Sequence, residues 1–139
     1  MRIRPPDLEV WGTSFVRSAL KAEGWDVEVD STIPAELVVP LARPLVVVRV
    51  DSLTRASPPL FDAALGVSVL AGSRQDDRKA RDLSALVFTI LTDEDVAVDE
   101  ATPVVDVDFE GCNGPYSIDD PLDVSRRYMT IAYTATGSW

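Results

Sequence analysis

FDAALGVSVLAGSRQDDRKARDLSALVFTIL, residues 61–91, holds a strand, a turn and an amphipathic helix in direct succession. Leu65, Val67 and Val69 alternate with smaller residues, which is typical of a strand with one buried face. Ser73 lies in the turn, where a hydroxyl can cap the first turn of a helix, so we expect the helix to start there. The apolar side chains of this helix then recur at helical spacing: Leu83, Leu86, Val87, Ile90 and Leu91. Because only a short turn joins the two elements, the apolar stripe must fold back onto the strand.

Outward from this stretch, periodicity and turn residues predict the remaining elements. Before it we expect a helix over residues 5–23 that ends at Gly24, then strands over 25–29 and 45–50. After it we expect strands over 104–109 and 126–136. The sequence therefore predicts a single α+β domain over residues 1–139, with a mostly antiparallel or mixed sheet of about five strands and two helices on one face. The predicted order is helix, strand, strand, strand, helix, strand, strand.

The segments between these elements divide into three kinds. Residues 52–60 and 111–125 have turn-rich composition and are predicted to be connections without a strand. Residues 30–44 are too apolar for a free loop, so they either pack on a neighbouring protein or cover the chain's own core. In the strand over 104–109, Val105, Val107 and Phe109 are predicted to form an apolar face opposite three carboxylates.

Composition limits the classes of function. The chain has a net charge of -10, with 46% hydrophobic and 26% charged residues, which indicates a globular protein without a basic surface for nucleic acid or membrane. No apolar run approaches the length of a membrane span, and MRIRPPDLE lacks a hydrophobic signal region. We therefore expect synthesis and use in the cytosol, or in an assembly built there.

Catalytic motifs are sparse in this sequence. There is no histidine to serve as a general base, and Cys112 is the single cysteine. No phosphate-binding glycine loop occurs. The run from Asp106 to Gly111 begins like a calcium loop, but Ser117 stands where the closing glutamate belongs. A solvated strand face explains these carboxylates better than a metal site does, and no cofactor is expected.

Two features indicate assembly with other subunits. Two helices cannot cover both faces of the sheet, and the small residues Ala64, Gly66 and Ser68 lie on the second face of their strand, where they leave room for a neighbour. The charges are also separated along the chain. Arg74, Arg78, Lys79 and Arg81 surround the start of the second helix. Eleven acids follow without a cation: Asp93, Glu94, Asp95, Asp99, Glu100, Asp106, Asp108, Glu110, Asp119, Asp120 and Asp123. Either these are solvated faces, or Arg74 and Arg78 contact the acidic region of an adjacent subunit.

Three segments carry a resemblance to a known family. RPPDLEVWGTSFVRSAL near the start, LGVSVLAGSRQDDRKARDLSALV in the middle and RRYMTIAYTATG at the end resemble the tail terminator (tail completion) proteins of long-tailed phages, especially those of actinobacteria. They span roughly half the chain and follow the family's order. None of them is a catalytic motif.

The resemblance implies a non-enzymatic virion protein that is assembled in the host cytoplasm. Such a protein forms a hexameric homo-oligomer on the head-proximal end of the tail tube, ends tube polymerisation and provides the head–tail joining surface. Its partners would be the major tail tube protein, the end of the tape measure protein and a head completion or connector protein. Under this hypothesis DNA passes through the ring without specific binding.

Acidic side chains facing the lumen would repel that DNA, and we expect them among Asp106, Asp108, Glu110, Asp119 and Asp120. Three alternatives stay open. One is a head completion or adaptor protein of the same virion. The second is a carboxylate-metal phosphoesterase built on the acidic strand, and the third is a generic acidic interaction module.

Overall fold

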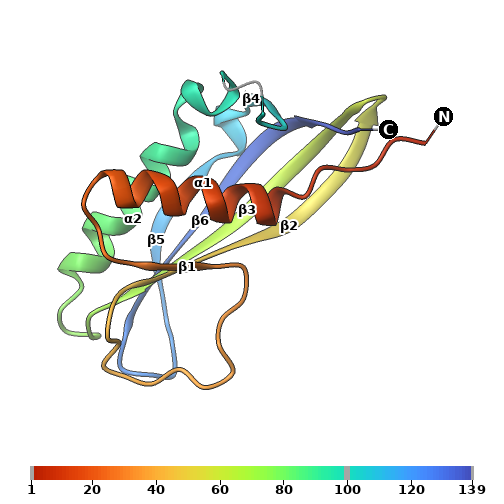
Figure 1. Cartoon of the computed structure of the whole chain (residues 1–139). Helices are drawn as coiled ribbons and strands as arrows, with labels where there is room; N and C mark the ends of the chain where they lie inside the picture. The colour runs from red at the N-terminus through yellow and green to blue at the C-terminus, as the bar shows by residue number, and fades with distance from the viewer. Residues whose placement is uncertain (1, 99–100, 139) are drawn as a thin grey trace.

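A computed structural model describes residues 2–98 and 101–138 (Figure 1). Within these residues the chain forms two α-helices, two short 3-10 helices and one mixed sheet of six strands. The sheet order is β1-β2-β3-β6-β4, with β5 also paired to β6. β1 runs parallel to β2, and the other pairs are antiparallel. The predicted α+β class and order of elements are confirmed, and the sheet gains one strand.

Helix α1 (Leu8–Ala22) begins later than expected. Asp7 is its N-cap, because the Asp7 carboxylate accepts a hydrogen bond from the Val10 amide at 3.1 Å. The two prolines precede the helix instead of forming its first turn. Its end is as predicted: Gly24 has a φ of 84°, and the Trp25 amide donates back to the Leu20 carbonyl at 3.0 Å.

Helix α2 (Arg78–Thr92) also begins later than the predicted start at Ser73. The Ser73 hydroxyl accepts from the Asp76 amide at 3.1 Å, which closes a local turn instead of capping the helix. Asp77 holds the N-cap position, but its carboxylate pairs with Arg81 at 3.2 Å and Arg127 at 3.0 Å. The helix therefore starts directly after Asp77, whose ion pair with Arg127 joins this part of the chain to the sheet.

Strands β2 (Leu45–Ser57) and β3 (Leu60–Ala71) form one long hairpin. The predicted connection over residues 52–60 is wrong, because β2 continues through it and turns only at residues 58–59. The polar side chains of residues 52–57 are typical of a loop, so the sequence pattern did not reveal this part of the strand. Its backbone nevertheless pairs with β3 from Leu45 to Ser57, with bulges after Val50 and Arg55. Residues 51–60, which we call the arm, project beyond the helices toward the chain termini (Figure 1).

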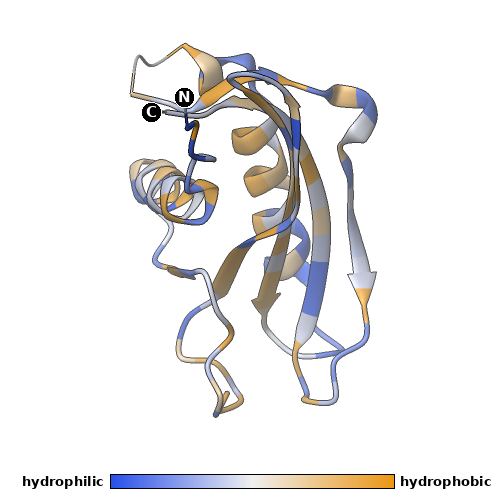
Figure 2. Cartoon of the chain, turned by 90° about the vertical axis from the view of Figure 1, so that its right-hand side faces the viewer, coloured by the Kyte–Doolittle hydropathy of each residue, from blue (hydrophilic) through white to orange (hydrophobic). Residues whose placement is uncertain are grey.

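Both helices pack on one face of the sheet (Figure 2). The core lies between them and the inward residues of β2, β3 and β6 (Ser125–Thr136). Among its fully buried members are Val48, Leu65, Met129 and Ile131. The predicted alternation of β6 is confirmed, since every second residue from Met129 to Ala135 is buried. Gly12 of α1 lets that helix approach β2, because an added Cβ would lie 3.0 Å from Val48.

A second, smaller core covers one end of the opposite face. Leu45, Val47, Leu70 and Val124 are buried there under Leu37, Val39, Leu41 and Leu122. The apolar residues of segment 30–44 thus cover the chain's own sheet, which was one of the two expectations for this segment. β1 is only Glu28–Asp30, shorter than predicted.

The acidic third of the chain differs most from expectation. β4 (Val104–Val107) is followed by a 3-10 turn, Phe109–Gly111, and then by β5 (Asn113–Ile118) within the predicted loop. A register shift after Val104 breaks the alternation, so Val104 and Val107 are buried while Val105 and Phe109 are exposed. β5 was missed because an edge strand paired on one side tolerates Gly and Pro. The other 3-10 helix, η1 (Glu94–Ala97), follows α2. Within the described residues no helix is long and apolar enough to cross a membrane.

Candidate functional site

The sheet presents a second face that no helix covers. Side chains alternate across a strand, so residues between the core positions of β3 and β6 point to this face. Beyond the end covered by segment 30–44 it forms what we call the open face. The open face consists of Arg49, Asp51, Asp62, Ala64, Gly66, Asp106, Tyr116, Tyr128, Thr130, Ala132 and Thr134. These side chains are small, hydroxylated or charged, which distinguishes this face from the core face.

A cluster of four side chains crosses the middle of the open face. The Tyr128 hydroxyl donates to the Asp51 carboxylate, and the Arg49 guanidinium lies 3.8 Å from the same group. Tyr116 of β5 packs edge-on to Tyr128 with 6.0 Å between ring centroids. Partial burial, followed by the hydrogen bond to Asp51, raises the pKa of Tyr128. The cluster thus connects β2, β6 and β5 across β3.

Gly66 lies directly beneath this cluster. A Cβ at Gly66 would overlap both the Asp51 carboxylate and the Tyr128 hydroxyl. Ser68 is also covered by its own chain: the residue is 3% exposed, and its hydroxyl accepts a hydrogen bond from Arg126 at 3.3 Å. Of the three small residues expected to leave room for a neighbour, only Ala64 stays partly accessible. A glycine inside a strand was the available signal for close approach, but the covering groups come from the same chain.

The start of α2 meets part of the acidic region within one chain. The Arg74 amide donates to the Asp123 carboxylate at 3.0 Å, and the Arg74 guanidinium donates to the Asp120 carbonyl. Asp120 pairs with Arg126 at 3.3 Å, with its own side chain only 8% exposed. Arg74 and Asp120 are therefore occupied internally. Arg78 stays exposed.

The acids expected to line a lumen fall into two groups. Asp106 of β4 pairs with Thr134 of β6. Asp119 directly follows Ile118, which pairs with Arg126 of β6. These two points on β6 are eight residues apart, or about 26 Å at roughly 3.3 Å per residue.

Asp106, Asp108 and Glu110 are exposed near one end of the sheet, and Asp119 near the other. Asp99 and Glu100 lie outside the described residues. The structure adds Asp62, which also pairs with Thr134 and shares the open face with Asp106.

The remaining candidates for chemistry are the Cys112 thiol and the carboxylates. The Cys112 thiol donates to the Asp108 carbonyl at 3.3 Å, and burial raises its pKa, which favours the unreactive thiol form. Within residues 2–98 and 101–138, no group of three or more His, Cys, Asp or Glu side chains is arranged to hold a metal ion. The most distinctive feature of the described surface is therefore the open face with its adjoining arm.

Among known proteins, no protein-family model matches this chain, and no curated protein matches it. The fold and the open face define an α+β protein with one helix-covered and one helix-free sheet surface.

Proposed function

We propose that this protein is a structural component of a phage virion, a tail terminator that forms a ring on the head-proximal end of the tail tube. The ring ends tube polymerisation and offers the surface for head–tail joining. Its partners are further copies of itself in a hexamer, the major tail tube protein, the end of the tape measure protein and a head connector protein. The resemblance in three segments and the order of elements support this proposal.

The observation that carries the proposal is the unpaired edge of strand β2. β1 pairs with β2 only from Leu45 to Val47, and no other strand within residues 2–98 and 101–138 pairs with that edge. From Asp51 to Ser57 every residue of β2 is exposed. Long exposed strand edges favour association with another chain. A neighbouring subunit would cover this edge, as assembly into a ring requires.

The chemistry of the open face supports passage of DNA. Asp62 and Asp106 flank Thr134 on that face, and both carboxylates are exposed without an ion pair in the described chain. Facing a lumen, they would repel phosphates within a Debye length of about 10 Å at 0.1 M salt. The Thr134 side chain between them offers no cation to retain DNA. This assignment requires the open face to point inward.

The first experiment is deletion of the gene in the virus that carries it, followed by electron microscopy of the particles. We expect overlong or unjoined tails, restored to normal by the wild-type gene supplied in trans. Normal tails with leaking heads would contradict the proposal and favour a head completion protein. Micromolar binding of magnesium, manganese or calcium, lost on Asp108→Asn, would favour a phosphoesterase instead.

The second experiment tests the direction of the open face. Asp62→Lys combined with Asp106→Lys reverses its charge, so complemented particles should have normal tails but deliver DNA poorly. Glu23→Lys with Glu36→Lys is the matched control, because it makes the same charge change at exposed positions off that region. Equal delivery by both double variants would refute an inward-facing open face.

A further inference from the structure

Helix α2 carries charges that add to its own macrodipole at both ends. Its first turn contains Arg78 and Lys79 and no acid, although cations there face the positive end of the helix. Its last turn contains no cation, and Asp93, Glu94 and Asp95 follow at the negative end. An isolated helix is destabilised by this arrangement. Charges of opposite sign from outside the helix would relieve it at each end.

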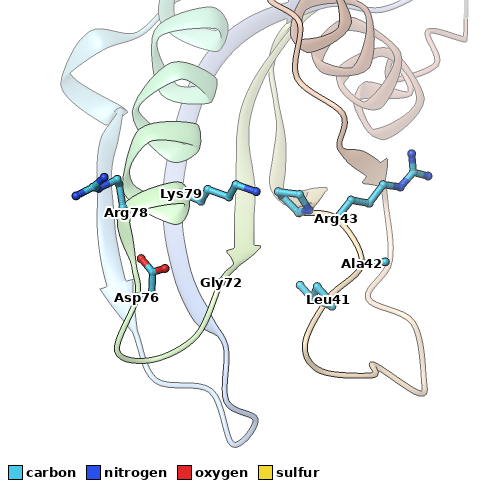
Figure 3. Close-up of a pocket in the computed structure, with 8 residues that line it drawn as sticks. Leu41, Ala42, Arg43, Gly72, Asp76, Arg78 and Lys79 are labelled. Carbon is cyan, nitrogen blue, oxygen red and sulfur yellow. The ribbon is translucent and has the colours of Figure 1, made fainter.

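The cation end opens into a cleft. About 560 Å³ in volume, it lies between the start of α2 and the loop before β2. We call it the Lys79 cleft; its lining is Leu41, Ala42, Arg43, Pro44, Gly72, Asp76, Arg78 and Lys79. Figure 3 shows the Lys79 side chain reaching across the cleft toward the loop that carries Arg43, whereas Arg78 leaves α2 on the other side.

The cations of this region differ in what they contact. Arg74 bonds to the 119–123 loop, and Arg81 pairs with Asp77. Arg43 pairs with Asp26 at 3.2 Å, but both groups are largely exposed. Within residues 2–98 and 101–138, neither Arg78 nor Lys79 has an ion pair. The cleft thus contains cations that the chain itself leaves uncompensated.

The opposite end of α2 has the complementary property. Asp93, Glu94 and Asp95 are exposed, and none of them has an ion pair in the described chain. The Asp93 carboxylate caps the following turn by accepting from the Asp95 amide at 2.9 Å. Helix α2 has 15 residues, so the two ends are separated by about 22 Å at roughly 1.5 Å per residue.

We propose that the Lys79 cleft of one copy receives the Glu94–Asp95 end of a second copy of this chain. The two surfaces are different and lie at opposite ends of one helix, so the contact is head-to-tail and can repeat around a closed ring. The partner is a second copy because the same chain supplies both uncompensated charges. This contact deepens the proposed function and rests on it for closure of the ring.

Zero-length carbodiimide cross-linking tests this contact directly, because it joins a lysine amine only to a carboxylate in contact with it. The chain has two lysines, Lys21 and Lys79, so the products are few. Equal amounts of unlabelled and ¹⁵N-labelled protein are mixed at high concentration and about 0.15 M salt, where the repulsion between net negative chains is screened beyond about 8 Å. Mass spectrometry then identifies products that contain both isotopes.

We expect mixed-isotope products that join Lys79 to Glu94 or Asp95. Lys79→Gln removes them, and Lys21→Gln, the matched control on the other helix, leaves them unchanged. Glu94→Gln with Asp95→Asn also removes them, whereas Glu36→Gln does not. Absence of mixed-isotope products, or products that join Lys79 only to Asp76 or to the 119–123 loop, would overturn the proposal.

The outcome separates this contact from the proposed function. If gene deletion yields overlong tails but Lys79 forms no intermolecular product, the terminator function stands and the ring uses another contact. If the products form but tails are unaffected by deletion, the contact stands and the function fails. Each experiment therefore has its own refutation.

Discussion

Gly66→Ala is the most informative single change in the sheet, because it separates two explanations of a small residue on the open face. If space above Gly66 were open, the added methyl group would be harmless. In the structure that methyl group would overlap the Asp51 carboxylate and the Tyr128 hydroxyl, which contact each other there. The change must therefore separate Asp51 from Tyr128. Gly66 has no positive φ, so alanine is otherwise compatible with the backbone.

The magnitude follows from two opposing terms. Replacing glycine by alanine inside a strand stabilises by about 0.5–1 kcal/mol, since the unfolded chain loses conformational freedom. Losing a hydrogen bond to a charged group costs about 1.5–3 kcal/mol, which we reduce to about 1–2 kcal/mol because of solvent exposure. The Asp51 side chain is 36% exposed. The net expectation is a decrease of about 0–1.5 kcal/mol in the free energy of unfolding.

Urea denaturation followed by tryptophan fluorescence measures this decrease, provided that the m-value is unchanged. The control is the same change in a background that carries Asp51→Ala and Tyr128→Phe. There the overlapping groups are gone, so Gly66→Ala is expected to stabilise by about 0.5–1 kcal/mol. A sign reversal between the two backgrounds supports the cluster. Equal stabilisation in both would refute it and restore an open space for a neighbour.

Three further substitutions test single contacts, two of them at helix ends. Tyr133→Phe should lower the free energy of unfolding by about 1–3 kcal/mol, because the Leu91 carbonyl in the last turn of α2 loses a buried donor. Burial raises the pKa of Tyr133, so its stabilising contribution is complete below the unfolded pKa of about 10 and is lost as pH rises above it. Denaturation at increasing alkaline pH should therefore show a shallower loss of stability in Tyr133→Phe than in wild type. Asp7→Ala should cost about 1 kcal/mol by removing the cap of α1. Asp26→Ala, which removes an exposed ion pair, should cost less than about 0.5 kcal/mol.

The basic and acidic segments are separate along the chain, but the fold brings part of them into contact. In sequence, a basic segment precedes a long acidic one. In the structure, the 119–123 loop returns to the basic segment and occupies Arg74, while Glu94 and Asp95 stay about one helix length away. Only some of these basic and acidic side chains are therefore available to contact a partner. The intermolecular contact that we propose is therefore restricted to Lys79 and its neighbours.

The sequence alone determined the elements whose pattern is local. The stripe that includes Leu83, Val87 and Leu91, the alternation of Met129, Ile131 and Tyr133, and the glycine end of α1 were all predicted and are present. Each depends on spacing within one segment, and burial of one face enforces that spacing. The α+β class follows from their order.

Tertiary structure decided what depends on partners distant in sequence. The extension of β2 through residues 51–57 and the presence of β5 rest on backbone pairing with neighbouring strands, which side-chain polarity does not reveal. The cover over Gly66 comes from Asp51 and Tyr128, which lie 15 residues before it and 62 after it. Such contacts are set by sheet register, a property of strands together. For this reason the small residues were recognised from sequence, but the groups that fill the space above them were not.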